Sequence, residues 1–396
     1  MDYLEELLHF PLPEQERYGY QFTAREIAQQ PATWLRTRNR ILEQLPAIQS
    51  FLLQAGLKKD RAERPEVFLV GAGSSDYIGR CLYYLLRRAW QCNVWPVPST
   101  DLLMDFGDLV ASSRPGLWIS FSRSGDSPEG AALIELALEK YPHIHHVIIS
   151  CNVSGKMGQL IAGRSNCLGI LLDEETNDRG LAMTSSFTNM MIAGQVLAHA
   201  WSSEAYDPIL TELCGAAAEF LPLAANAAKA IAEQAYPQVC FAGSGAQAGT
   251  ATEAALKLLE LTAGRVQTMA HTPLGLRHGP MAALTRETLF VSFLSNDIRR
   301  QRYESDLLHE IERKKLVGKS LAILGSGTST DLSLGGASIL MSRKAWSVPD
   351  LYRPPVDILF AQLLGLFSSL RYGLKPDAPS PTGAISRVVH PIEVYY

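Results

Sequence analysis

Short apolar runs alternate with segments of helical periodicity along most of this chain. In the first half the apolar runs are VFLVGAG, NVWPV, LWISFS, HHVIISCN and CLGILLD, and helices are expected at 75–89, 128–140 and 184–200. Continuous apolar strands separated by helices are typical of a parallel sheet with helices on both faces. The pattern therefore predicts an α/β domain.

A second round of the same pattern begins near Ala216. The runs VFLVGAGSS and VCFAGSGAQ each place a Gly-x-Gly turn at the end of an apolar strand, one in each half of the chain. Similarity at domain spacing indicates a duplication. In the second round we expect helices at 216–235, 249–263, 301–315 and 356–372, and strands in QVCFAGSG, RVQTM, TLFVSFLSN, SLAILGS and ASILMS.

The residues before the first strand have a helical pattern. From Thr23 to about Gln54 apolar residues recur at helical spacing, and Pro31 and Pro46 interrupt them. A chain of 396 residues also exceeds the size of one ordinary core. We predict a helical extension at 1–60, one α/β domain at 61–212, a second at 213–375 and a tail at 376–396.

Composition narrows the class of protein. Hydrophobic residues make up 47% of the chain and charged residues 19%, which is typical of a globular protein, and the net charge of −4 gives no general attraction to nucleic acid or anionic membranes. Six cysteines are scattered without a C-x-x-C pair, as expected for reduced thiols in a cytosol. The N-terminus has no basic leader, and polar residues or glycines interrupt the most apolar segments. We expect a cytoplasmic protein that binds neither nucleic acid nor membrane.

The segment WISFSRSGDSPEG at 118–130 runs from an apolar strand through a hydroxyl-rich turn into a helix that begins near Pro128. The unpaired N–H groups and positive dipole of a helix N-terminus favour an anion there, and Ser122, Ser124 and Ser127 would add hydroxyls. The lysine of a nucleotide triphosphate loop is missing, so a sugar monophosphate is the expected ligand. The alternative is that these residues only cap the helix.

The two glycine turns, at 71–75 and 243–248, superficially resemble dinucleotide-binding loops. Asp76 replaces a required small residue in the first, and no acidic residue follows the second at about 20 positions, so we reject that interpretation. Gly71, Gly73 and their counterparts instead allow sharp turns at the carboxyl ends of strands, where open α/β sheets bind ligands. Ser75 either adds a hydroxyl to the phosphate site or caps the helix.

The helix TATEAALKLLELT carries one charged strip on an otherwise apolar surface. Glu253, Lys257 and Glu260 lie on this strip at 100° per residue. A carboxylate on a buried helix must be paired, protonated or exposed to a cavity. An internal Glu–Lys pair is one interpretation. We favour a cavity, where the pKa of the carboxyl would be raised and the group could move a proton between adjacent sugar carbons.

Residues 271–284, HTPLGLRHGPMAAL, are expected to form a loop because of their Pro and Gly content. His278 could protonate a ring oxygen and open a hemiacetal, although a surface histidine is the commoner case. His271 is a weaker candidate. Thr184 and Ser185 are candidates for sugar contacts or helix caps. The histidines of KYPHIHHVII, His143, His145 and His146, are interpreted as a solvated connector and not as a metal site.

Taken together, these motifs resemble the sugar isomerase (SIS) family with two SIS domains. SRSGDS resembles its phosphate loop, ALKLLE followed by RHGP its catalytic helix and histidine loop, and TAREIAQQPATW before them resembles the AgaS-type branch. The resemblance, which covers about residues 60–390, implies an α/β fold of two SIS domains, each a parallel sheet flanked by helices. It assigns proton transfer to Glu260 with Lys257 beside it, ring opening to His278, and phosphate or sugar binding to Gly73, Ser75, Ser122, Arg123, Ser124, Ser127, Thr184 and Ser185.

The AgaS-type branch implies conversion of galactosamine 6-phosphate and water to tagatose 6-phosphate and ammonia, with no metal or redox cofactor. Glutamine is not expected as a nitrogen source, because residue 2 is Asp where glutamine-dependent relatives carry a nucleophilic cysteine. The tail 380–389 lacks the lysine that forms an imine in those relatives. The family also implies a homodimer in which the histidine loop serves the neighbouring subunit. Two alternatives remain: an isomerase of neutral hexose 6-phosphates, and a non-catalytic sugar-phosphate-binding regulator.

Overall fold

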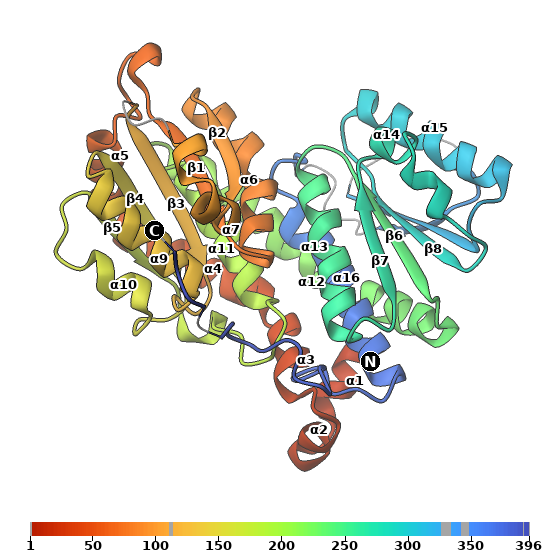
Figure 1. Cartoon of the computed structure of the whole chain (residues 1–396). Coiled ribbons are helices and arrows are strands. Elements are labelled where there is room, and N and C mark those ends of the chain that lie inside the picture. The colour runs from red at the N-terminus through yellow and green to blue at the C-terminus, as the bar shows by residue number, and fades with distance from the viewer. Residues whose placement is uncertain (1, 111–113, 326–333, 342–347, 391, 396) are drawn as a thin grey trace. The chain divides into compact units, whose positions relative to one another are not determined.

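The structure is a computed structural model that describes residues 2–110, 114–325, 334–341, 348–390 and 392–395. The chain divides into two compact units, each built on its own five-stranded sheet (Figure 1). The first-sheet unit comprises Ala32–Asp178, Ser185–Pro208 and Ser386–Tyr396, and the second-sheet unit comprises Met1–Pro31, Arg179–Thr184 and Ile209–Ile385. Each unit therefore combines segments that lie far apart in the sequence.

In the first-sheet unit all strands are parallel and lie in the order β2-β1-β3-β4-β5. Helices cover both faces of this sheet, and the side chains of each strand point alternately to one face and the other. Leu69 of β1 contacts Gly79 in the helix on one face, whereas Phe68 and Val70 pack with Leu133 in the helix on the opposite face. The elements are β1 (Glu66–Gly71), α6 (Ser74–Trp90), β2 (Val94–Pro98), α7 (Ser99–Met104), α8 (Phe106–Leu109), β3 (Gly116–Ser122), α9 (Pro128–Lys140), β4 (Ile144–Ser150), α10 (Lys156–Ile161), β5 (Cys167–Leu171) and α11 (Ser185–Ala198).

The second-sheet unit repeats this topology. Its parallel strands lie in the order β10-β9-β8-β6-β7, which is the first order when each strand is replaced by its counterpart. Gly73 and Gly245 adopt nearly the same backbone conformation, with φ of 56° and 62° and ψ of −125° and −126°. The elements are α12 (Asp207–Gln234), β6 (Gln238–Gly243), α13 (Ala246–Leu261), β7 (Gln267–His271), α14 (Pro273–Leu276), β8 (Thr288–Phe293), α15 (Ile298–Lys314), β9 (Lys319–Leu324), β10 (Ser338–Met341) and α16 (Pro354–Arg371).

The predicted fold class of two parallel α/β sheets is thus confirmed, together with a helical N-terminal region. Proline sits in the first turn of three of its helices, at Pro13, Pro31 and Pro46, where the missing N–H costs nothing. The five helices are α1 (Tyr3–His9), α2 (Leu12–Tyr18), α3 (Gln21–Ala28), α4 (Gln30–Glu43) and α5 (Leu45–Gln54). The first two lie before the periodic segment that begins at Thr23, and seven residues give too little periodicity to detect.

We expect polar residues or glycines to interrupt every long apolar segment, but one helical stretch does not follow this expectation. Ser203–Gln234 is long and apolar enough to cross a membrane by length and composition alone. In the structure its alanine-rich side is buried in the core, with Ala216, Ala217, Ala224 and Ala228 fully covered. The same composition is expected of a core helix whose small residues allow close packing.

The run HHVIISCN was expected as a strand, and the interpretation of its histidines as a solvated connector holds for the exposed His143 but is wrong for His146. His145 and His146 lie in strand β4, and the side chain of His146 is fully buried with its ring edge-on to Trp118 at 5.4 Å between centroids. Neither ring nitrogen of His146 has a hydrogen-bond partner among the described residues. Burial lowers the pKa of His146 to about 3, so the imidazole is neutral and acts as an aromatic core residue.

This burial predicts a loss of stability in acid. An exposed histidine has a pKa of 6.5, whereas the pKa of buried His146 is about 3. As the pH falls from 6.5 toward 3, His146 therefore binds a proton in the unfolded chain but not in the folded chain. Each pH unit in this window lowers the free energy of unfolding by about 1.4 kcal/mol. We expect His146→Leu to flatten the urea-unfolding profile between pH 6.5 and pH 4 by this slope.

His143→Leu is the matched control, because His143 is exposed in the connection before the same strand. This variant should keep the slope of the unsubstituted protein. Equal slopes for His146→Leu and the unsubstituted protein would contradict a buried neutral imidazole.

Candidate active site

In the hydroxyl-rich turn between β3 and α9, serine side chains form hydrogen bonds with the backbone of the same turn. Ser122 Oγ accepts the N–H of Gly125 at 3.0 Å, and Ser124 Oγ accepts the N–H of Asp126 at 3.1 Å. Ser127 caps α9 by accepting the N–H of Gly130 at 3.3 Å. A hydroxyl that accepts an N–H still has its own O–H to donate. Capping and phosphate binding are therefore compatible at Ser122 and Ser124.

The turn is braced from behind by the loop that follows β4. Gly125 has φ of +66°, and a Cβ on Gly155 would lie 2.7 Å from the carbonyl oxygen of Ser124, so the two loops touch through their glycines. Asp126 Oδ1 accepts the N–H of Lys156 at 2.8 Å, and Asn152 Nδ2 donates to the carbonyl of Ser124 at 2.7 Å. These contacts fix the turn before any ligand arrives.

Arg123 lies in the same turn, but its guanidinium donates to the backbone carbonyl of Arg387 in the C-terminal tail. Arg387 in turn donates from Nε to the carbonyl of Asp178 at 2.6 Å and from Nη2 to Asn177 Oδ1 at 2.6 Å. In this structure Arg123 therefore ties the tail to the turn. Its predicted contact with phosphate stays a prediction.

The glycine turn after β1 brings α6 close to the same strand ends. A Cβ on Gly71 would lie 2.3 Å from the backbone carbon of Ser75, so glycine is required there. Ser75 is buried and Gly73 is exposed. Asp76, the residue whose side chain argued against a dinucleotide-binding loop, is also buried. Its carboxylate pairs with Arg80 at 2.9 Å, and its Oδ1 has no hydrogen-bond partner among the described residues. Desolvation raises the pKa of Asp76, and Arg80 opposes that rise.

Thr184 and Ser185 are fully buried at the start of α11. The carboxylate of Asp178 accepts the backbone N–H groups of Ser185 and Ser186, both at 2.9 Å. The carboxylate of Asp178, seven residues before Ser185, therefore satisfies two N–H groups in the first turn of this helix. A direct sugar contact by Thr184 or Ser185 stays a prediction.

The counterpart turn in the second-sheet unit, residues 294–297 after β8, is filled by a carboxylate of the chain itself. Asp350 accepts the N–H of Asn296 at 2.7 Å and the hydroxyl of Ser295. Asp350 also pairs with the buried Arg353 at 3.2 Å. A carboxylate offers the same acceptor oxygens as a phosphate. The second turn is therefore internally satisfied, and the turn after β3 is the better candidate for an external phosphate.

The charged strip on α13 forms an ion network around one buried cation. Lys257 is 1% exposed, and its Nζ lies 2.5 Å from Glu260 Oε2 and 3.4 Å from Glu253 Oε1. Glu253 is fully buried, whereas the side chain of Glu260 is 23% exposed. The interpretation as an internal Glu–Lys pair is therefore confirmed. One carboxylate of the network, Glu260, also reaches solvent, and a cavity beside it stays a prediction.

Helix α16 buries this network by a close approach to α13. A Cβ on Gly365 would lie 2.5 Å from Leu261 Cδ1 and 3.3 Å from the carbonyl oxygen of Lys257. Because Gly365 has no side chain, the two helices can meet at this point, as the contact between them in Figure 1 indicates.

The segment 271–284 is more ordered than the expected loop. His271 ends strand β7, residues 273–276 form α14 with Thr272 as its N-cap, and residues 280–283 form a 3₁₀ turn. Pro273 and Pro280, which made a loop the expectation, occupy the first positions of these two short helical segments, where proline is favoured. His278 is exposed between them, and among the described residues no hydrogen bond or ion pair joins it to Glu260. Burial lowers the pKa of His271.

Within the described part of the chain, no group of three or more His, Cys, Asp or Glu side chains is placed to hold a metal ion. The candidate residues instead form two clusters, the serine turn in the first-sheet unit and the α13 network in the second-sheet unit. Duplicated parallel sheets carrying these two clusters define a phosphosugar isomerase fold with two SIS domains.

The comparisons with known proteins agree with this class, although no protein-family model matches the chain. The chain is 33% identical over 376 residues to the D-galactosamine-6-phosphate deaminase AgaS of Escherichia coli O157:H7, covering 94% of this chain and 95% of that protein. It is 33% identical over 384 residues to the AgaS deaminase of Shewanella sp. strain ANA-3, covering 96% and 93%. A solved tagatose-6-phosphate ketose/aldose isomerase from Escherichia coli superimposes with a TM-score of 0.83 at 32% identity, covering 93% and 96%. The chain belongs to the AgaS family of D-galactosamine-6-phosphate deaminases.

The internal carboxylate in the second turn can be tested by chemical rescue. Asp350→Ala should lower the free energy of unfolding by about 2–4 kcal/mol, because it leaves Arg353 and the donors of Asn296 and Ser295 short of a buried partner. Added formate should restore part of this loss in urea titrations, since a small carboxylate fits the vacated position.

Asp297→Ala is the control in the same turn, where Asp297 caps α15 at the N–H of Arg300. It should cost about 1 kcal/mol and gain nothing from formate. Equal responses of the two variants to formate would show that Asp350 does not act as an internal anion.

Proposed function

We propose that this chain converts galactosamine 6-phosphate and water to tagatose 6-phosphate and ammonia. The observation that carries the proposal is the α13 network, in which Glu260 is the one carboxylate of three charged groups that reaches solvent. The similarity to AgaS deaminases over more than nine-tenths of both chains supports the choice of substrate. In this proposal the serine turn after β3 binds the phosphate, and Glu260 moves the proton.

Phosphate binding falls to the turn after β3. The O–H groups of Ser122 and Ser124 would donate hydrogen bonds to the phosphate oxygens. The positive end of the α9 dipole would attract the negative charge of the phosphate. Because Asn152 and Asp126 already fix the turn, little ordering entropy is lost on binding. The net charge of −4 leaves such local donors as the source of affinity for an anionic sugar.

Proton transfer falls to Glu260. Its carboxylate would remove the proton from C2 of the open-chain amino sugar and return it to C1. The nitrogen loses a proton and O1 gains one, so that the aldehyde becomes an alcohol and the C2 amine becomes an imine. Lys257, at 2.5 Å, stabilises the ionised carboxylate before it takes the C2 proton and after it has returned the proton to C1. Water then adds to the imine carbon and ammonia leaves, which gives the ketose. Atoms balance without a redox cofactor, and the net reaction is a hydrolytic deamination.

Ring opening falls to His278, and we propose that it acts in the site of a second subunit. The imidazole of His278 is exposed and has no bond to Glu260 among the described residues. It is therefore available to contact the active site of a second subunit. A homodimer with shared active sites would follow. A cytoplasmic location accords with a phosphorylated substrate and with the free thiols of the six cysteines.

An isomerase of neutral hexose 6-phosphates is the second candidate, because the same carboxylate transfer serves both reactions and the solved relative is named a tagatose-6-phosphate ketose/aldose isomerase. Release of ammonia distinguishes the two. The deaminase is favoured by the AgaS relatives. A non-catalytic regulator is not favoured, since the named relatives are enzymes.

Replacement of the proposed proton carrier gives the main test. Glu260→Gln should lower ammonia release from galactosamine 6-phosphate by about 100-fold or more, because the amide cannot accept the C2 proton. Calorimetry should show unchanged substrate binding. The matched variant Ser124→Ala should raise KM with little effect on kcat, because it removes a phosphate donor. Normal turnover by Glu260→Gln would refute the assignment.

Mixed oligomers test the shared site. Glu260→Gln and His278→Ala should each be inactive alone. When the two are unfolded together and refolded at equal amounts, half of the dimers contain one of each, and one of their two sites is intact. We therefore expect recovery of about a quarter of normal activity. No recovery, with normal dimers in sedimentation, would place His278 and Glu260 in the same subunit's site.

A further inference from the structure

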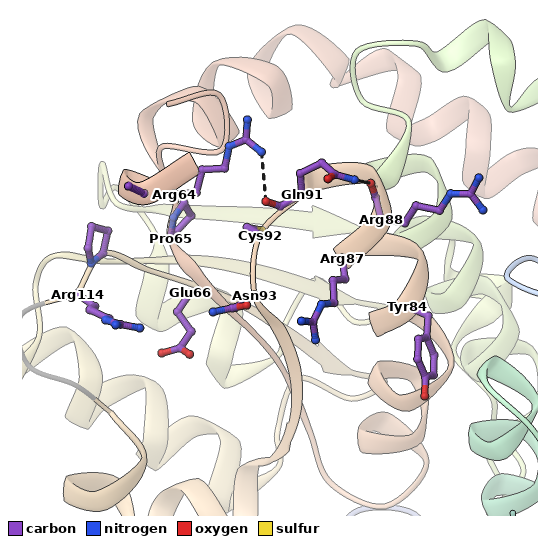
Figure 2. A pocket seen from close by; sticks show the side chains of 12 residues that line it. Arg64, Pro65, Glu66, Tyr84, Arg87, Arg88, Gln91, Cys92, Asn93 and Arg114 are labelled. Carbon is purple, nitrogen blue, oxygen red and sulfur yellow. Dashed lines mark hydrogen bonds between the residues drawn. The ribbon is translucent and has the colours of Figure 1, made fainter. Parts of the chain in front are cut away.

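A cavity in the first-sheet unit lies at the amino ends of its strands. It has a volume of about 630 Å³ and opens between the start of β1, the residues before β2 and the end of α6 (Figure 2). Small-molecule sites usually have volumes of roughly 300–1,000 Å³. The side chains around it are Ala62, Arg64, Pro65, Glu66, Tyr84, Arg87, Arg88, Gln91, Cys92, Asn93, Arg114 and Pro115.

The lining of this cavity is strongly basic. The lining includes four arginines and one carboxylate, that of Glu66, whereas the chain as a whole is acidic with a net charge of −4. Among the described residues, Arg87, Arg88 and Arg114 have no carboxylate within 4.0 Å. The positive charge is therefore not neutralised by ion pairs within this part of the chain.

Two of the arginines are positioned to act on a ligand. Figure 2 shows Arg87 and Arg114 pointing into the same space, beside Asn93 and Glu66. The guanidinium of Arg87 lies over the ring of Trp95, 5.6 Å from its centroid, which restricts its orientation. Arg64 is held back by the carbonyls of Lys59 and Trp90, at 3.0 and 2.9 Å, and Arg88 points away in the same view.

The cavity is separate from the proposed phosphate turn within the same unit. The turn follows the carboxyl end of β3, whereas Glu66 begins β1 and Pro115 precedes β3 at the opposite edge of the sheet. A strand of six residues spans about 20 Å. One sugar monophosphate therefore does not reach both places.

We propose that this cavity binds a second ligand, a small organic diphosphate that bears hydroxyl groups. Paired guanidinium groups match the geometry of phosphate oxygens, and two of them suit a ligand with two phosphate groups. Glu66 repels a third anionic group but accepts a hydrogen bond from a hydroxyl, and the amide of Asn93 offers both a donor and an acceptor. The exposed ring of Tyr84 at the rim gives the organic part a surface to lie on.

The test uses inorganic pyrophosphate and ADP as probes, with fluorescence of Trp95 as the local signal. We expect both probes to quench this signal, and Trp95→Phe to remove the change. The double variant Arg87→Gln/Arg114→Gln should bind pyrophosphate about tenfold more weakly or worse. ADP should bind more tightly than pyrophosphate, and Tyr84→Ala should remove that advantage.

Two control variants separate this site from others. Arg299→Gln/Arg302→Gln removes two exposed charges on α15 and should leave binding unchanged. Ser124→Ala/Ser127→Ala alters the phosphate turn and should also leave the Trp95 signal unchanged. Equal loss in the two arginine pairs would mean nonspecific charge attraction, and loss in the serine variant would mean that the probe binds the turn. A change in oligomeric state without a change in pyrophosphate binding would assign the cavity to a subunit contact. Each of these results would overturn the proposal.

Discussion

The proposed chemistry depends on one buried cation, Lys257 of α13. A lysine that is 1% exposed is stable only if nearby carboxylates compensate for its lost hydration, and Glu253 and Glu260 do so one turn before and one turn after it. Glu253 is sealed in the core, so it fixes the lysine in place. Glu260 is partly exposed, so it can give up this interaction in part and exchange a proton. The close approach of α16 at Gly365 creates the burial that makes these charges interact strongly.

Duplication supplied two similar turns, and their different contents separate their roles. The turn after β8 is occupied by Asp350, whose charge Arg353 balances inside the core. The turn after β3 satisfies its backbone with hydroxyls, which retain donors for an external anion. The same topology thus yields a structural turn in one unit and a candidate phosphate site in the other.

The fold was largely predictable, because long apolar strands and strongly periodic helices carry clear signals; α9 begins at Pro128 and ends at Lys140 as expected. The errors arose where tertiary burial decides. His146 is polar by residue type, yet it lies in the core beside Trp118. At the candidate site, helical spacing placed Glu253, Lys257 and Glu260 together, but no spacing distinguishes the sealed carboxylate from the exposed one. The basic cavity joins arginines from three separate segments, so no local pattern in the sequence could indicate it.

Proton transfer by Glu260 is measured most directly as the rate at which galactosamine 6-phosphate loses its C2 proton, followed by proton NMR in deuterated water. We predict fast loss with the unsubstituted chain, slower loss with Glu260→Asp, whose carboxylate is one carbon shorter, and the slowest loss with Glu260→Gln. Loss of the C2 proton at the same rate in all three proteins would contradict a role for this carboxylate in moving the proton.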